Sequence, residues 1–262
     1  MRWPLFVVML MCGCETLENR FVFHPRPSDA KNAAPLPPPL EDVELRTIDG
    51  IKIHARWCPH PQAKGAVLYC HGNAGNLEYF GKVARDFHAS LDRSVLIFDY
   101  PGYGRSDGKP NEAGCYKSAK AAYEWLTSRK GIAPERIVIA GESLGGGVAV
   151  QLASQSPHQA LVLIRTFTSV PEVAKQSFVL ASAPSIMVNR FESEKRIAEC
   201  KSPIFIAQAD KDRLIPFAQG ERLRDACKAP VRFHVLRGLD HNDPLPADFF
   251  AALRGFLDQA EW

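Results

Sequence analysis

Residues Arg136–Leu152 read RIVIAGESLGGGVAVQL, and this segment is the strongest indication of the fold. Five mostly apolar residues lead directly into Gly141-Glu142-Ser143-Leu144-Gly145, and a helix-like run follows. A G-x-S-x-G pattern between a strand and a helix holds its serine on a strained turn with the hydroxyl exposed. The segment therefore predicts a nucleophile at Ser143. The alternative is that Ser143 is only the N-cap of a structural helix.

A second G-x-S-x-G match occurs at residues 104–108, where the sequence reads GRSDG. It precedes Lys109-Pro110-Asn111, so no helix is expected directly after its serine. The strand–turn–helix context that the motif requires is therefore missing. We interpret residues 104–108 as a structural loop.

Short apolar runs bounded by Gly, Pro or Asp are typical of strands buried on both faces of a parallel sheet. They are Ala66–Cys70, Ser94–Phe98, Arg136–Ala140, Ala160–Ile164, Pro203–Ala207 and Val231–Leu236. Two further runs, Val43–Ile48 and Ile51–Trp57, flank Asp49-Gly50 and predict a hairpin.

Segments with helical spacing alternate with these runs. They are Leu77–Leu91, Gly114–Leu126, Val148–Ala153, Gln219–Cys227 and Ala247–Leu257. The alternation predicts an α/β fold with a mostly parallel central sheet of about eight strands and helices on both faces. Residues 165–200 interrupt the pattern, and we interpret them as a short lid.

A serine nucleophile needs a general base, and His241 has the best setting of the eight histidines. It lies in a short loop after the last apolar run, where such folds present their base. His234 lies within that run and is expected to pack on the sheet, and His71 is assigned a structural hydrogen bond. The remaining histidines lack a suitable setting and are expected at the surface: His24, His54, His60, His88 and His158.

An acid is needed to orient His241 and to stabilise its imidazolium. Asp212 lies in the loop ADKDRLIP, which follows the apolar run Pro203–Ala207. Asp210 is the near competitor, and we interpret it as a turn-former. The resulting chain order of Ser, Asp and His is that of α/β-hydrolases.

The loop His71–Asn76, HGNAGN, follows another apolar run. A loop of small residues there can turn backbone amides toward the oxyanion of an acyl-transfer reaction. We expect the amides of Leu144 and Asn73 to be the two donors, with Ala74 as a less favoured alternative to Asn73. The other interpretation is a purely structural turn.

Composition and charge limit the remaining functions. The 262-residue chain has a net charge of +3 and no basic block with interleaved aromatics, so no nucleic-acid partner is expected. Its seven cysteines show neither zinc spacing nor a disulfide framework. We therefore expect no metal and no cofactor, and we interpret Cys70 as a small buried hydrophobe.

The N-terminus reads MRWPLFVVMLMCGC and resembles a bacterial lipoprotein signal. Its apolar stretch is too short to span a bilayer. We predict a signal peptide over residues 1–14, lipidation at Cys14, and attachment to a membrane surface facing the periplasm or cell exterior. The alternatives are a plain signal peptide, an uncleaved anchor, or a hydrophobic helix of a cytoplasmic protein.

Residues 15–40 form an N-terminal arm and a Pro-rich spacer in this interpretation. Proline biases the spacer toward an extended conformation without a core of its own. The FVFHP segment at residues 21–25 is expected to pack on the domain. The catalytic domain then covers residues 41–262.

Several motifs in order, from HGNAGN, FDYPGYGRSDGKP and GESLGGGVA to TFTSV, NRFES, ADKDRLIP and GLDHND, resemble the Bem46-like branch of the α/β-hydrolase superfamily. This branch lies near the mammalian α/β-hydrolase domain-containing proteins 13 and 17. The resemblance implies the α/β-hydrolase fold and a triad of Ser143, Asp212 and His241. Arg165-Thr166 and Gln208-Ala209 depart from the branch's usual residues, so the pocket edges are expected to differ.

These features together predict a serine hydrolase that cleaves an ester or thioester through an acyl-enzyme. The expected substrate is a small molecule or an acylated protein. A peptidase, or a non-catalytic lipoprotein that uses the scaffold for binding, is the alternative. Oligomeric state and acyl length are not predicted.

Overall fold

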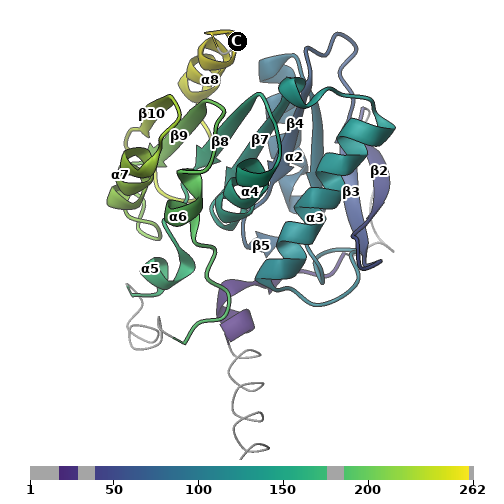
Figure 1. Ribbon diagram of the computed structural model, residues 1–262, viewed down its shortest axis with the longest axis horizontal. Coiled ribbons are helices and arrows are strands. Elements are labelled where there is room, and N and C mark those ends of the chain that lie inside the picture. Colours follow the sequence, from purple (N-terminus) through teal and green to yellow (C-terminus); the bar gives the residue numbers. More distant parts are fainter. Residues whose placement is uncertain (1–17, 29–38, 176–185, 260–262) are drawn as a thin grey trace, which may run out of the picture.

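The computed structural model describes residues 18–28, 39–175 and 186–259. Its core is an eight-stranded sheet in the order β10-β9-β8-β7-β4-β6-β3-β2 (Figure 1). The strands are β2 (Glu41–Arg46), β3 (Lys52–Cys58), β4 (Ala66–Cys70), β6 (Ser94–Phe98), β7 (Ile137–Glu142), β8 (Ala160–Ile164), β9 (Ile204–Ala209) and β10 (Val231–Leu236). Four of them have the bounds predicted from the apolar runs.

The sheet is mostly parallel, as predicted. β2 pairs with β3, and β3 with β6, in antiparallel fashion, whereas the five pairings from β10 to β6 are parallel. Because β4, β6, β7, β8 and β9 are buried on both faces, their side chains form continuous apolar runs. The carboxyl ends of the parallel strands therefore meet at one edge of the sheet.

Helices cover both faces of the sheet. They are α2 (Leu77–Leu91), α3 (Glu112–Glu124), α4 (Leu144–Gln155), α5 (Val170–Ala174), α6 (Ser193–Ile197), α7 (Phe217–Ala226) and α8 (Ala247–Gln259). Residues of α3, α4, α6 and α7 share one hydrophobic core cluster, and residues of α2 and α8 share the other. Figure 1 shows α3, α4, α6 and α7 on the near face, with α2 behind the sheet.

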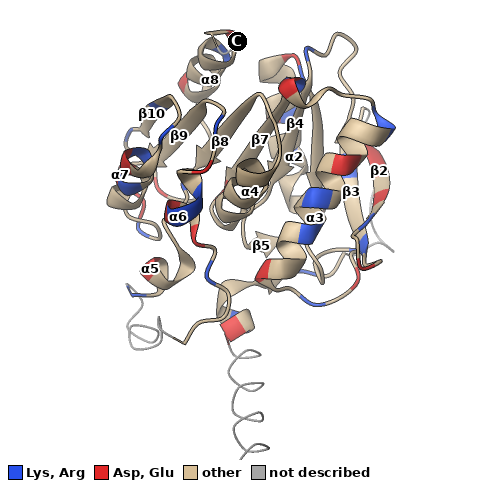
Figure 2. Cartoon of the chain, in the orientation of Figure 1, with Lys and Arg blue, Asp and Glu red and all other residues tan. Residues whose placement is uncertain are grey.

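Charged side chains avoid the helix that follows the predicted nucleophile. In Figure 2, α4 carries no Lys, Arg, Asp or Glu, whereas α3, α6 and α7 carry both signs. Nine of the twelve residues of α4 are buried. This helix is therefore an internal element, and its position against the sheet fixes the position of its first turn.

The N-terminal arm packs on the domain. A two-residue strand, β1 (His24–Pro25), pairs in parallel with β5 (Ala74–Gly75). Val22 and Phe23 are buried, and Phe23 packs edge-to-face on Phe191. The expected packing of the FVFHP segment is confirmed.

Other N-terminal predictions and part of the lid fall outside the described residues. Cys14 and the proposed signal peptide lie there, as do residues 176–185 of the predicted lid. Within the described segments, no helix combines the length and hydropathy needed to cross a bilayer.

Candidate active site

The carboxyl edge of the sheet brings three predicted residues together. Ser143 follows β7, Asp212 lies in the loop after β9, and His241 lies in the loop after β10. His241 Nε2 lies 3.1 Å from Ser143 Oγ, and His241 Nδ1 lies 2.7 Å from Asp212 Oδ2. A carboxylate can only accept here, so Nδ1 carries the proton and Nε2 is left to face the hydroxyl.

The turn at Ser143 has the strained geometry of a nucleophile elbow. Its φ of 52° is in the left-handed region that non-glycine residues rarely adopt. Ser143 is the N-cap residue of α4, yet its side chain makes no capping hydrogen bond. The hydroxyl is therefore directed to His241 instead of capping the helix.

Close backbone packing explains the glycine after the elbow. A Cβ on Gly145 would lie 2.0 Å from the carbonyl oxygen of Cys70 at the end of β4. No real side chain can approach a backbone atom so closely. Gly145 therefore lets α4 approach the sheet closely enough to present Ser143 at its edge.

Asp212 is held by the backbone of its own loop. Its Oδ1 accepts hydrogen bonds from the amides of Leu214 at 2.9 Å and Ile215 at 2.7 Å, which leaves Oδ2 for His241. The competitor Asp210 instead accepts from the amide of Gly238 at 2.6 Å. Asp210 therefore ties the loop after β9 to the loop after β10, which is a different role from the turn-former predicted for it.

A second carboxylate joins the acid loop to the base loop. Asp240 accepts from the backbone amides of Arg213 at 3.0 Å and His241 at 2.8 Å, and it also pairs with the Arg213 guanidinium. These backbone hydrogen bonds, followed by the Arg213 side chain, lower the pKa of Asp240 to about 2. Asp240 is therefore ionised at neutral pH and holds the two loops in register.

A buried ion pair lies beside the nucleophile. Arg165, which is 4% exposed, follows β8 with a positive φ of 47°. Its guanidinium pairs with Glu142 and donates to the carbonyl of Asp243 at 2.5 Å. Glu142 also accepts from the hydroxyl of Tyr69 at 2.5 Å. The pair thus links the nucleophile elbow to the loop that carries the predicted base.

The glycine loop lies directly against the predicted nucleophile. A Cβ on Gly72 would lie 3.6 Å from the Cβ of Ser143. His71 Nδ1 donates to the Gly72 carbonyl at 2.7 Å, which is the structural hydrogen bond predicted for this histidine. The assignment of the Asn73 and Leu144 amides as oxyanion donors stays a prediction.

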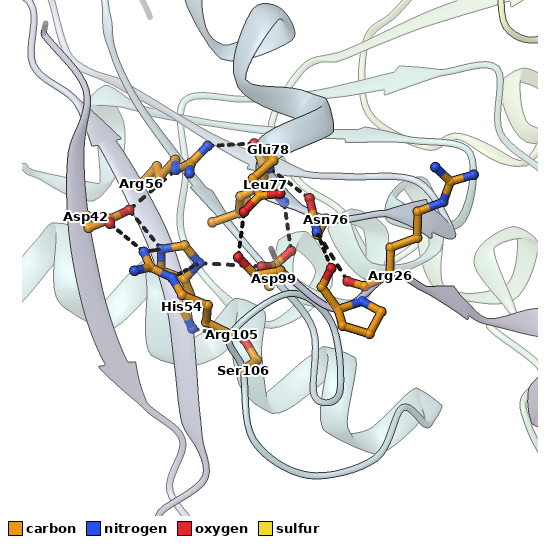
Figure 3. A network of polar contacts seen from close by, with 12 residues as sticks. Arg26, Asp42, His54, Arg56, Asn76, Leu77, Glu78, Asp99, Arg105 and Ser106 are labelled. Atoms are coloured by element: carbon orange, nitrogen blue, oxygen red, sulfur yellow. Dashed lines mark hydrogen bonds and ion pairs between the residues drawn. The ribbon is translucent and has the colours of Figure 1, made fainter. Parts of the chain in front are cut away.

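Behind this loop lies a buried polar network that the sequence did not indicate (Figure 3). The fully buried Asp99 lies 3.6 Å from His54 Nδ1 and 3.5 Å from His71 Nε2, and it accepts from the Leu77 amide at 3.1 Å. Burial raises the pKa of Asp99, but the two histidines that face it outweigh this effect and lower the pKa below its usual value. The network supports the loop from behind.

The surface position predicted for two histidines is wrong. His54 is 8% exposed because its ring lies between Asp42 and Asp99, and His158 is 7% exposed with Nδ1 bonded to the Ser156 carbonyl at 2.8 Å. Burial lowers the pKa of His158, although that hydrogen bond raises it. Neither ring faces Ser143, so the choice of His241 is unaffected.

A cavity of about 530 Å³ opens over Ser143 and His241. This volume lies within the range of small-molecule sites. One side is formed by α2 through Tyr79 and Val83, and apolar residues after β10 line it as well. Of the described residues between 165 and 200, only Arg165 lines this cavity. Much of its wall is therefore supplied by elements outside the predicted lid.

Within residues 18–28, 39–175 and 186–259, no group of three or more His, Cys, Asp or Glu side chains could hold a metal ion.

Comparison with known proteins identifies the family. The chain is 31% identical over 230 residues to Protein bem46 of Schizosaccharomyces pombe, which covers 83% of this chain and 76% of that protein. The chain belongs to the Bem46-like branch of the α/β-hydrolases. The α/β-hydrolase fold family model matches residues 65–182 of this Bem46-like protein.

Two further similarities agree with this assignment. An uncharacterized protein of Mycobacterium tuberculosis is 36% identical over 247 residues, covering 92% of the Bem46-like chain and 88% of its relative. A solved Pyrococcus furiosus esterase has a TM-score of 0.73 at 18% identity, covering 91% of this chain and 98% of the esterase. The structural similarity supports the fold, and the family assignment places the Bem46-like protein among the α/β-hydrolases.

Sequence reasoning missed the roles of Arg165 and Asp99. Arg165 was noted only as a departure from the branch's pattern, yet it bridges Glu142 and the base loop. The available signal was the opposite charge of Glu142 at the end of β7 and Arg165 directly after β8. That signal becomes informative only once β7 and β8 are known to be neighbours.

Proposed function

We propose that this Bem46-like protein is a serine hydrolase that cleaves esters or thioesters through a Ser143–His241–Asp212 triad. The observation that carries the proposal is the pair of contacts made by His241, at 3.1 Å to Ser143 Oγ and 2.7 Å to Asp212 Oδ2. A scaffold with a purely binding role has no physical need for a strained serine whose hydroxyl faces an oriented imidazole.

The reaction follows from these contacts. His241 Nε2 takes the proton of Ser143 as its oxygen attacks the acyl carbon, and Asp212 stabilises the imidazolium that forms. The imidazolium then protonates the leaving alcohol or thiol, which departs and leaves an acyl-serine. Water, deprotonated by the same nitrogen, attacks the acyl-serine and releases the carboxylic acid.

Backbone amides are assigned to the developing oxyanion. The amide of Leu144 lies at the start of α4, where helix N–H groups have no intrahelical partner. The amide of Asn73 lies in the glycine loop that packs against Ser143. Two such donors are worth several kcal/mol in a preorganised site, since losing one typically lowers the rate by about 10²–10³-fold.

The cavity favours acyl groups that enter from the surface. Its entrance carries the largely exposed side chains of Tyr79 and Leu214, which offer apolar contact without enclosing the substrate. We assign a small-molecule ester or an acylated protein as the substrate class. Rates on matched ester, thioester and amide substrates would rank the three bonds, and a preference for the amide would establish the peptidase alternative.

We also propose that Cys14 carries the lipid of a bacterial lipoprotein and tethers the enzyme to a membrane surface. The proposal depends on the apolar run before Gly13-Cys14. Mass spectrometry of the mature N-terminus from the native host tests it. A diacylated residue 14 is expected, and an unmodified Cys14 or an intact Met1 would contradict it.

Phosphonate labelling tests the nucleophile. A fluorophosphonate probe should modify the wild type at Ser143, and peptide mass spectrometry should place the adduct there. Ser143→Ala should remain unlabelled while keeping its circular dichroism spectrum. A folded wild type that takes no label would favour the binding-module alternative.

A further inference from the structure

We propose that residues 22–28 of the N-terminal arm are a positioning element of the active site, which holds the glycine loop in the conformation that binds the oxyanion. This proposal rests on the proposed hydrolase function. It assigns a role in catalysis to a segment that precedes the first strand of the main sheet.

The arm is joined to the glycine loop by a parallel ladder. The amide of His24 donates to the Asn73 carbonyl at 3.0 Å, and the amide of Arg26 donates to the Gly75 carbonyl at 3.1 Å. On its other side, the Arg26 carbonyl accepts from the Gly104 amide at 3.0 Å. Residues 22–28 therefore lie between the glycine loop and the loop around Gly104, bonded to both.

Side chains of the glycine loop reinforce this contact. Asn73 Nδ2 donates to the Val22 carbonyl at 3.3 Å and lies 3.1 Å from His24 Nδ1. Asn76 Nδ2 donates to the Arg26 carbonyl at 3.2 Å, as Figure 3 shows. The side chain of the predicted oxyanion residue is thus committed to the arm, and its backbone amide is the group assigned to the substrate.

The arm fixes one of two successive peptide planes. The Asn73 carbonyl accepts from the amide of His24 and from the hydroxyl of Tyr103 at 2.7 Å, while His71 fixes the preceding carbonyl of Gly72. In a planar trans peptide the N–H and C=O point in opposite directions, so a fixed carbonyl also fixes the next amide. His71 therefore fixes the peptide plane that contains the Asn73 N–H. The arm fixes the next peptide plane, which contains the Asn73 carbonyl and the Ala74 N–H.

The arm is itself anchored on both sides of its start. Phe23 is buried against Phe191, and Glu18 accepts from the backbone amides of Val188 and Asn189 at 2.9 and 2.7 Å. These contacts hold the arm to the domain independently of the ladder. It can therefore restrain the loop without adding a flexible end to the site.

Backbone substitution in the full chain tests the proposal. His24→Pro removes the amide that donates to Asn73, whereas His24→Ala keeps it and removes only the imidazole. We expect His24→Pro to lower kcat on p-nitrophenyl butyrate by about 10–100-fold with KM changed less than about threefold, because Tyr103 alone then holds the Asn73 carbonyl and the loop that carries the oxyanion amide is less well positioned. His24→Ala should show a smaller loss of kcat than His24→Pro.

Hydrogen exchange of the wild type supplies a test that needs no variant. The amides of His24 and Arg26 should exchange at least about tenfold more slowly than in a free peptide, because both are donated to the loop. Exchange at the rate of free peptide would overturn the proposal. In a folded His24→Pro variant, peptides over residues 71–76 should exchange faster than in wild type.

The outcomes separate this inference from the proposed function. An active wild type with His24→Pro equal to His24→Ala leaves the hydrolase standing and overturns the role of the arm. A larger loss in KM than in kcat also overturns it, because a change in the loop that binds the oxyanion acts on kcat. A folded wild type that neither turns over esters nor reacts with the phosphonate overturns the proposed function, and the catalytic role of the arm with it.

Discussion

Replacing Arg165 with methionine should destabilise the fold and disturb the base together. The arginine pairs with Glu142, whose side chain is 13% exposed, and donates to the Asp243 carbonyl at 2.5 Å. Methionine keeps an apolar stem of similar length but has no donor for either partner. The variant therefore leaves a largely buried carboxylate without its cation and releases the loop that carries His241.

The expected magnitude follows from the burial of the pair. Breaking a buried ion pair by removing one partner typically costs about 3–5 kcal/mol, and we expect Arg165→Met to lower the free energy of unfolding by this amount. A misplacement of about 1 Å near the reacting atoms can lower the rate by about 10²-fold. We therefore expect kcat/KM on p-nitrophenyl butyrate to fall by about that factor.

Urea unfolding and ester kinetics measure the two effects. Adding Glu142→Gln to Arg165→Met should restore more than about 1 kcal/mol of the free energy of unfolding, since no charge is then left buried. Arg213→Met is the matched control, because it breaks an ion pair to Asp240, which lies in the loop that also carries Asp243. Since the Arg213 side chain is exposed, the loss should cost less than about 1 kcal/mol. A loss in Arg165→Met no larger than in Arg213→Met, without recovery in the double variant, would refute this reasoning.

Three further predictions address the acid, the elbow and the buried network. Asp212→Asn should lower kcat by about 10³–10⁴-fold while Asp210→Asn stays within about threefold, and equal losses in ester kinetics would reject the choice of acid. Gly145→Ala should lower the free energy of unfolding, measured in urea, by more than about 3 kcal/mol, because its Cβ would meet a backbone oxygen. Gly255→Ala in α8 has open space around its Cβ and should raise that free energy by about 0.5–1 kcal/mol. The lowered pKa of Asp99 gives stability that is fully present above about pH 4 and is lost as pH falls through the folded pKa. Asp99→Asn should therefore have a lower free energy of unfolding than wild type at pH 7, and that free energy should fall less on acidification. A curve of unfolding free energy against pH that runs parallel to the wild-type curve would contradict this.

The local sequence pattern was sufficient to predict the central sheet and the three residues that lie together at its edge. Apolar runs such as Ala66–Cys70 and Ser94–Phe98 mark strands because both faces of a parallel strand are buried. Once these strands are parallel, the residues after them lie at one edge. That geometry is why Ser143, Asp212 and His241 lie together although 98 residues separate the first from the last.

The supporting contacts depend on strand order, which no local pattern contains. His54 lies beside Asp99 because β3 pairs with β6 in antiparallel fashion, with Ala55 opposite Phe98. Arg165 meets Glu142 because β8 lies next to β7. The arm was recognised only as a segment that packs on the domain, because two-residue ladders such as β1 with β5 leave no periodic signal.

The most direct test of the account is the turnover of p-nitrophenyl acetate, butyrate and octanoate by the full chain beside Ser143→Ala. We predict that the wild type hydrolyses at least one of these esters and that the folded variant is slower by at least about 10³-fold. Equal rates for the two proteins, whether both measurable or both zero, would contradict the assignment of Ser143 as the nucleophile of an ester hydrolase.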